Sequence, residues 1–398
     1  MRIIFFVILV DLIGFGIMIP LLPNFADELS GSTGLATLVV GLYAAGMLFS
    51  TTVMGRLSDF YGRRPVLLLS MAGATLGYVA LSFSTTITMV AAARLFSGLM
   101  AGNISTAQAY ITDITTPENR AKGMGMIGAA FGLGFIIGPT IGSLMSGDDF
   151  KAISLATAGL TSAALSGLAF LTILFKLPES LSKEQRDALR HEKRISQFKA
   201  LGQVMTRPVI LAMLVSILIY NTAAGMAETI LPIWTKKIGV IQSPDELFHY
   251  LLPAGLMLAI VQGGLVGPIQ KRIGEYKMVF TGLSLFAVAL VAMGYFGSQG
   301  SKLGTIVSLC FQSCGAGLFM PALQSLVSQR AGDTERGMVM GLYSSFGMLG
   351  RTIGTIGTGF VMSNIYIHAP YYGGALLAIF LILMISFLNN RMANKPAA

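Results

Sequence analysis

Five ionisable residues interrupt the long apolar stretches of this chain or lie at the end of one: Asp11, Arg94, Asp113, Glu228 and Arg351. An ionisable group inside a long apolar segment is costly, so it usually faces a water-filled cavity or an oppositely charged side chain. Such groups can take up a proton, bind a charged ligand or join helices by ion pairs. They are therefore the first candidates for a functional site.

Asp11 lies roughly 12 Å into the first apolar stretch, counted at the helical rise per residue. A carboxyl in apolar surroundings can accept and release a proton near neutral pH. The alternative is a structural acid that accepts hydrogen bonds from a neighbouring helix. Phe15 and Met18 follow Asp11 on the same helical face, so we consider them candidate contacts for a ligand.

Glu228 shares a helical face with Asn221 and Gly225, at spacings of seven and three residues. This face is small and polar, as expected for a cavity wall, which makes Glu228 and Asn221 candidate contacts for a ligand. The alternative is an acid that is paired with a neighbouring side chain. For Arg351 three roles stay open: it balances Glu228, meets an anionic group of a ligand, or completes a network between helices.

Arg94 begins another polar face, which we predict to continue through Gly98, Ala101, Ser105 and Gln108 along one helix. We expect this face to line a cavity, in which Arg94 supplies a fixed positive charge and Gln108 contacts a ligand. A structural ion pair is the alternative role for Arg94.

The sequence gives no support for a metal site, a cofactor or an enzyme. His191, His249 and His368 are scattered, and Cys310 and Cys314 lie in one apolar stretch, where we predict small buried residues. The nucleotide-binding pattern G-x-x-x-x-G-K-[ST] is absent. No Ser/His/Asp or Cys/His arrangement occurs in the polar segments. We therefore expect no cofactor, no metal ion and no enzymatic activity.

Composition places the ionisable residues in membrane-spanning helices. Of the 398 residues, 54% are hydrophobic and 11% are charged, whereas soluble domains contain about a quarter of charged residues. A helix that crosses a bilayer needs about 20 mostly apolar residues. Such stretches occur near residues 3–23, 35–54, 66–84, 87–112, 122–145, 152–175, 208–234, 247–270, 277–297, 303–327, 337–362 and 371–388. The predicted fold class is an all-α polytopic membrane protein with twelve transmembrane helices.

The twelve stretches divide into two halves. The only long polar segment, 176–207, is predicted to be a cytoplasmic linker between an N-terminal six-helix bundle, 1–175, and a C-terminal six-helix bundle, 208–398. Segment 55–65 has a weaker copy at 267–277, which is 212 residues later. Two shorter patterns recur at similar shifts, so we predict that one six-helix unit is used twice and that a ligand binds between the halves.

The positive charges predict the orientation of the helices. With the amino terminus inside, the tails and the even-numbered connections hold 21 of the 27 Lys and Arg residues. Cytoplasmic loops of membrane proteins carry such an excess. We therefore expect both termini to be cytoplasmic, and we assign the net charge of +9 to topology rather than to nucleic-acid binding.

The segment from Gly55 to Pro65 reads G-R-L-S-D-F-Y-G-R-R-P and resembles the signature loop of the major facilitator superfamily. The resemblance implies a latch that holds the two halves closed toward the cytoplasm; its residues would be Gly55, Asp59, Gly62, Arg63, Arg64 and Asp113. A solvated acid at a helix end is the alternative for Asp113. The copy at 267–277 has no acid at the position of Asp59, so we expect a stronger latch in the first half.

Two more segments narrow the resemblance. Gly134, Gly138, Pro139 and Gly142 match the antiporter pattern in the fifth span of the drug/proton antiporter branch of that superfamily. The first span, from Asp11 onward, is similar to that of the same twelve-helix branch, which includes tetracycline and multidrug exporters. Small residues allow helices to approach closely, and Pro139 favours a kink because it removes a helical hydrogen bond.

This resemblance implies a proton-coupled transporter that exports amphipathic, cationic or zwitterionic small molecules by alternating access. Asp11 or Glu228 would carry the proton, and Arg94 would tune its affinity. Expected partners are the substrate, protons and membrane lipids, with a monomeric chain in the bacterial inner membrane and a proton gradient in place of a cofactor. The alternatives are an exporter of a single metabolite, siderophore or lipid, and a receptor-like or scaffold protein of the same fold.

Overall fold

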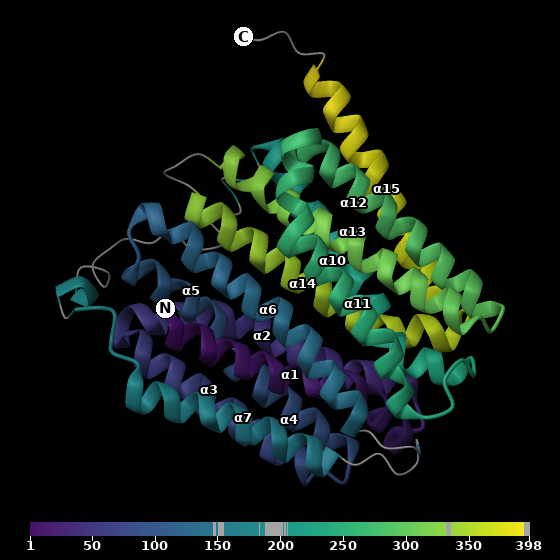
Figure 1. Cartoon of the computed structure of the whole chain (residues 1–398), viewed down its shortest axis with the longest axis horizontal. Helices are drawn as coiled ribbons and strands as arrows, with labels where there is room; N and C mark the ends of the chain where they lie inside the picture. Colours follow the sequence, from purple (N-terminus) through teal and green to yellow (C-terminus); the bar gives the residue numbers. More distant parts are fainter. Residues whose placement is uncertain are drawn as a thin grey trace. The chain divides into compact units, whose positions relative to one another are not determined.

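The computed structural model is helical, and its ribbon is drawn in Figure 1. The structure describes residues 1–145, 149, 155–182, 184–187, 202, 204, 206–331 and 336–393, without the side chains of 52, 117–122, 124, 125, 336, 337 and 388–393. Every regular element in these ranges is a helix, which confirms the predicted fold class.

The chain forms two compact units. Unit 1 contains Met1–Lys193 and Ile241–Leu252, and unit 2 contains Arg194–Val240 and Pro253–Ala398. The chain after the sixth predicted span thus continues in unit 1 before it enters unit 2. Of the predicted linker, residues 183, 188–201, 203 and 205 lie outside the described residues.

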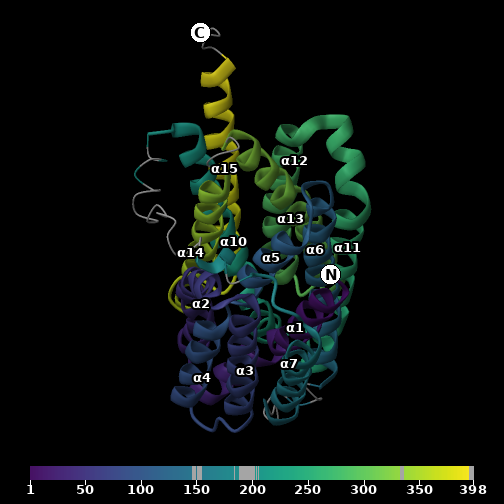
Figure 2. The ribbon, with the colours of Figure 1, turned by 90° about the vertical axis from the view of Figure 1, so that its left-hand side faces the viewer.

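In the described residues, the main elements of unit 1 are seven α-helices and one 3-10 helix. They are α1 (Arg2–Ser30), α2 (Thr33–Tyr61), α3 (Arg63–Ser82), α4 (Ile87–Met100), α5 (Asn103–Ile114), α6 (Pro117–Met145), α7 (Leu155–Lys176) and the 3-10 helix η2 (Pro244–Leu247). Gly31 ends α1 with a φ of 62°, a conformation that favours glycine. Ser32 and Thr86 cap α2 and α4 by accepting hydrogen bonds from the backbone N–H groups of Leu35 and Met89. Figure 2 shows α2, α3 and α4 as neighbours.

The helices α1 and α6 pack with their backbones in close contact. A Cβ atom added at Gly138 would lie 2.7 Å from Cα of Gly16, and one added at Gly16 would lie 2.8 Å from Cδ of Pro139. Gly134 and Gly142 also face α1, against Leu12 and Ile17. The segment that resembles the antiporter pattern therefore fixes the distance between α1, which carries Asp11, and α6. The residues on both sides of Pro139 remain helical.

The predicted fourth span is not one helix. It divides into α4 and α5 at Ala101 and Gly102, whose N–H groups donate to the carbonyl oxygens of Gly98 and Met100. The hydroxyl of Ser70 donates to the same Met100 carbonyl. The predicted face from Arg94 to Gln108 is therefore not carried by one uninterrupted helix: Arg94, Gly98 and Ala101 are buried, whereas Gln108 is exposed.

Unit 2 has the same helical character. Its elements are α10 (Pro208–Lys237), α11 (Phe248–Ile260), the π-helical turn η3 (Val261–Leu265), α12 (Val266–Ser298), α13 (Lys302–Arg330), α14 (Arg336–Asn364) and α15 (Ala369–Ala393), with the first residues of α11 in unit 1. Gly274 interrupts α12 with a φ of 76° and a ψ of 165°. This residue lies between the predicted eighth and ninth spans.

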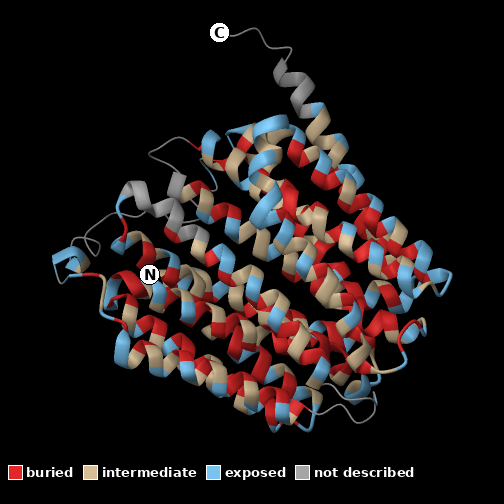
Figure 3. Cartoon of the chain, viewed as in Figure 1, coloured by how far each residue is buried: buried red, intermediate tan, exposed pale blue. Residues whose placement is uncertain are grey.

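The helices have the length and the exposed apolar surface of membrane spans. Ten helical stretches in the described ranges are long and apolar enough to cross a bilayer, and one of them, Pro244–Ser298, contains two predicted spans. The remaining predicted span lies in α14, which has 29 residues. Buried and exposed residues alternate along the helices in Figure 3. Large apolar side chains such as Phe175 and Leu303 are exposed, as expected of helices that face lipid.

Candidate functional site

Asp11 is buried in unit 1 at the junction of α1, α5 and α7. Its Oδ2 accepts a 2.5 Å hydrogen bond from Nδ2 of Asn103, and its Oδ1 accepts one of 3.3 Å from the hydroxyl of Ser166. Within the described part of the chain, Asp11 forms no ion pair with a cation. The carboxyl is thus held by neutral donors. This is the arrangement expected of a structural acid that accepts hydrogen bonds from neighbouring helices. It also leaves the carboxyl free to bind a proton.

A cavity of about 20 Å³ adjoins Asp11, which is enough space for one water molecule. Its polar lining comes from five helices of unit 1: Asp11, Tyr43, Ser70, Tyr78, Ser97 and Asn103. The hydroxyl of Ser97 is buried and has no hydrogen-bond partner among the described residues. A water molecule at this position would satisfy that hydroxyl.

Arg94 is buried near this cavity, and no carboxylate of the described residues forms an ion pair with it. Its guanidinium carbon lies 4.3 Å from the centre of the Tyr43 ring, a cation–π geometry. Its Nε and Nη1 have no hydrogen-bond partner in the described ranges. Tyr43 contacts Arg94 and also lines the cavity beside Asp11, so it connects the two charged groups.

The predicted ligand contacts in unit 1 do not line this cavity. Met18 is 2% exposed and packs in an apolar core with residues such as Leu21. The ring of Phe15 lies 5.2 Å from that of Tyr43, and Gln108 is exposed on α5. Periodicity placed Phe15 and Met18 on the face of Asp11; in the structure Met18 is buried by packing, whereas Phe15 is half-buried.

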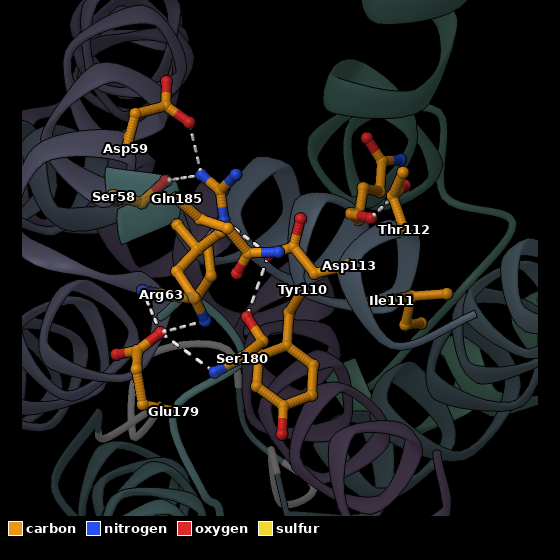
Figure 4. Close-up of polar contacts among 12 residues, drawn as sticks. Ser58, Asp59, Arg63, Tyr110, Ile111, Thr112, Asp113, Glu179, Ser180 and Gln185 are labelled. Atoms are coloured by element: carbon orange, nitrogen blue, oxygen red, sulfur yellow. Dashed lines mark hydrogen bonds and ion pairs between the residues drawn. The ribbon is translucent and has the colours of Figure 1, made fainter. Parts of the chain in front are cut away.

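The structure brings Asp59, Arg63 and Asp113 together within unit 1 (Figure 4). Nη1 of Arg63 donates to Oδ1 of Asp59 at 2.6 Å and to the hydroxyl of Ser58 at 2.7 Å. Its Nε donates to Oδ2 of Asp113 at 2.9 Å. Arg63 is buried, and two carboxylates compensate its charge, so this cluster joins the end of α2 and the start of α3 to the end of α5.

Glu179, which the sequence analysis did not identify, holds the turn between α2 and α3. Its carboxylate accepts hydrogen bonds from the backbone N–H groups of Arg63, at 2.8 Å, and Arg64, at 3.1 Å. Gly62 has a φ of 104°, and a Cβ atom there would overlap the Glu179 carboxylate. Acids favour the amino terminus of a helix. The signal in the sequence is an acid that directly follows the sixth apolar stretch.

Three further hydrogen bonds lie beside this cluster. The hydroxyl of Ser180 donates to Oδ2 of Asp113 at 2.8 Å. Nη2 of Arg64 donates to the carbonyl oxygen of Leu174 at 2.7 Å. Gly55 contributes its carbonyl, which accepts from the Ser58 hydroxyl at 2.7 Å, and a Cβ atom there would meet nothing within 4 Å.

Glu228 and Arg351 form an ion pair in unit 2. Nη2 of Arg351 lies 2.6 Å from Oε2 of Glu228, and their side chains are 38% and 46% exposed. A Cβ atom at Gly225 would lie 2.9 Å from the backbone oxygen of Arg351, so α10 and α14 pack closely beneath the pair. Asn221 donates to the carbonyl of Ile217 in its own helix. Three roles for Arg351 were open from the sequence. This ion pair favours the role in which Arg351 balances the charge of Glu228.

A sequence model described as Major Facilitator Superfamily matches residues 4–303 and 251–397. The chain belongs to this superfamily. The chain is 31% identical over 335 residues to the tetracycline resistance protein, class C, of Escherichia coli, which covers 83% of this chain and 81% of that protein. It is 28% identical over 372 residues to multidrug resistance protein 2 of Bacillus subtilis, covering 92% and 88% of the two chains.

Solved structures share the major facilitator fold with this chain. A D-xylose-proton symporter superimposes with a TM-score of 0.79 at 15% identity and covers 96% of both chains. A human organic anion transporter superimposes with a TM-score of 0.72 at 22% identity, covering 96% of this chain and 98% of that one. The protein is thus a multi-pass membrane transporter of this superfamily. In the described residues no three His, Cys, Asp or Glu side chains are grouped to hold a metal ion.

Proposed function

We propose that this major facilitator transporter exports amphipathic small molecules, cationic or zwitterionic, in exchange for protons by alternating access. The observation that carries the proposal is Asp11, a buried carboxyl that neutral donors hold in the middle of a packed bundle. The relatives named for tetracycline resistance and multidrug resistance support export of foreign compounds. We assign the protein to the bacterial inner membrane on the same ground.

Protonation of Asp11 would change its contacts with two helices. In the ionised form both carboxyl oxygens accept hydrogen bonds, one from Asn103 and one from Ser166. A protonated carboxyl needs an acceptor for its own O–H group, which the hydroxyl of Ser166 can supply by rotation, whereas the amide N–H group of Asn103 cannot. Asn103 begins α5 directly after the break at Gly102, so a proton on Asp11 acts at the point where the fourth span is interrupted.

The Glu228 and Arg351 pair would bind the cargo. Two charges on a half-exposed face of apolar helices are costly in lipid, so such a face normally lines water. A cationic group of the cargo can compete with Arg351 for the Glu228 carboxylate. A zwitterionic cargo can bind both side chains once their mutual ion pair opens.

The proposal is tested in inverted vesicles that contain a pH-sensitive dye and a panel of candidate cargoes. A proton gradient is first formed, with the vesicle interior acidic. Addition of a transported cargo should then release protons from the vesicles. Asp11→Asn should abolish this release, because an amide cannot bind and release a proton in the same range. Ser166→Ala removes one hydrogen bond but leaves the carboxyl, so it should reduce the release without abolishing it. Unchanged proton release in Asp11→Asn would exclude Asp11 as the coupling group.

A further inference from the structure

Two loops, 212 residues apart, share one backbone geometry and carry opposite charges at two corresponding positions. Gly62 has a φ of 104° and a ψ of 159°, and Gly274 has a φ of 76° and a ψ of 165°. Each glycine precedes the first turn of a helix. In the first loop Arg63 follows the glycine, and in the second loop Glu275 occupies this position.

The reversal extends to the position four residues earlier. Asp59 of the first loop corresponds to Lys271 of the second, so the acid and the base have exchanged places in both positions. Lys271 is exposed and is not a partner of Glu275 in the structure. The acid of the second loop therefore stands at the position of Arg63 and not at the position of Asp59.

Glu275 is the centre of a polar cluster in unit 2. Its Oε1 accepts hydrogen bonds from Nε2 of Gln270 at 2.9 Å, from the hydroxyl of Ser325 at 3.0 Å and from Nε2 of Gln329 at 2.8 Å. The cluster joins the segment before Gly274, the segment after it and the end of α13.

The partners have changed together with the central residue. Gln270 and Ser325 lie 212 residues after Ser58 and Asp113, which are partners of Arg63. A guanidinium needs acceptors, and Asp113 supplies a carboxylate. A carboxylate needs donors, and Ser325 supplies a hydroxyl at the corresponding place. Three positions thus differ in a chemically consistent way between the two copies.

We infer that Glu275, held by Gln270, Ser325 and Gln329, is the centre of a second latch, equivalent to the Arg63 cluster with its charge inverted. This latch fixes the turn at Gly274 to the end of α13. One charged residue with neutral donors takes the place of an ion-paired guanidinium, and hydrogen bonds that involve a charged group are stronger than neutral ones. Glu275 is a positioning residue, because it orders the loop rather than contacting a cargo.

Hydrogen exchange of the purified full-length protein tests the latch without a transport assay. Glu275→Ala should raise amide exchange in peptides that cover 266–280 and 320–331 by about tenfold, the effect of losing a hydrogen bond to a charged group. Glu275→Gln should give a smaller rise, because its carbonyl still accepts. Lys277→Gln, in the same loop, is the control and should leave exchange unchanged. Equal exchange in Glu275→Ala and Lys277→Gln would overturn the inference.

A transplant tests the equivalence of the two clusters. Glu275→Arg alone places a guanidinium among donors and should increase exchange in the same peptides. Combination with Gln270→Ser, Lys271→Asp and Ser325→Asp rebuilds the first cluster and should restore protection. If this quadruple variant exchanges as fast as Glu275→Arg, the clusters are not equivalent. An effect of these variants on cargo-driven proton release would depend on the proposed function. The exchange result does not depend on it, so the second latch and the proposed function can be disproved separately.

Discussion

At the scale of single residues, three charged groups of the described chain differ in their environments. Asp11 is buried among neutral donors, Arg63 is buried between two carboxylates, and Glu228 is half-exposed with one arginine. Loss of one member of a buried ion pair costs several kcal/mol, about 3–5, because it leaves a charge uncompensated. An exposed pair contributes about 1 kcal/mol or less. Substitutions should therefore affect structure at Arg63 and ligand binding at Glu228.

We expect Asp59→Asn to lower cargo-driven proton release at least about threefold without lowering the amount of protein in the membrane. Arg63 loses one charge-assisted hydrogen bond, of the order of 1.5–3 kcal/mol, but keeps Asp113, so the fold is retained. The measurement is the initial rate in vesicles, normalised to transporter content. Arg56→Gln, on the exposed side of the same segment, serves as the control. A rate for Asp59→Asn equal to that of the control would count against the latch.

His368 predicts a pH dependence of stability. Nε1 of the buried Trp234 donates to Nδ1 of His368 at 3.1 Å, and burial lowers the pKa of this histidine. As pH falls below about 6.5, the unfolded chain binds a proton that the folded chain does not, so the free energy of unfolding falls until the folded pKa is reached. Above that pH the stability from this group is complete.

Thermal unfolding in detergent between pH 7.5 and 5.5 measures this effect. The wild-type Tm should fall with pH, and His368→Gln, whose carbonyl can accept from Trp234, should show a smaller fall. His249→Gln is the control, because His249 is exposed. The same pH slope in the wild type and in His368→Gln would show that another group is responsible.

At the scale of helices, backbone contacts position the charged residues. Glycines in α1 and α6 allow the contact beside Leu12, and the break at Gly102 directs Asn103 to Asp11. The positions of the glycines in the sequence indicated close packing. They did not indicate which helices meet, because a small residue is equally compatible with several neighbours, and a helical period cannot reveal where a helix breaks.

We expect Gly138→Ala to destabilise the protein by about 1–3 kcal/mol, the usual cost of overpacking. The added methyl group would lie 2.7 Å from Gly16 Cα and from the Ile13 carbonyl oxygen, so α1 must move away from α6. Thermal unfolding should show a lower Tm. Gly128→Ala on the same helix, where an added Cβ meets nothing within 4 Å, should leave it equal or higher. Equal stability of the two variants would contradict the close contact.

At the scale of the whole molecule, two units with corresponding loops belong to one superfamily fold. The excess of basic residues predicts that 55–65 and 267–277 both lie at the cytoplasmic side. The two latches would then act on the same side of the membrane, one built on a cation and the other on an anion.

Cysteine labelling of intact cells tests this orientation. In a background with Cys310 and Cys314 replaced by serine, Lys302→Cys should react with a membrane-impermeant maleimide, and Arg56→Cys should react only after the cells are opened. The reason is the charge distribution, which assigns Lys302 to the outer side and Arg56 to the inner side. Labelling of Arg56→Cys in intact cells would reverse the predicted topology.

The sequence by itself determined the class of protein and the approximate spans, and it singled out Asp59, Arg63 and Asp113, which lie together in the structure. These features depend on composition and on spacing along the chain, and both can be counted. The tertiary structure decided which side chains meet: Asp11 with Asn103, Glu179 with the start of α3, and Glu275 with Ser325. These partners are separated by 92, 116 and 50 residues. Their contacts depend on the rotation and breaks of whole helices, which close packing sets and local periodicity does not specify.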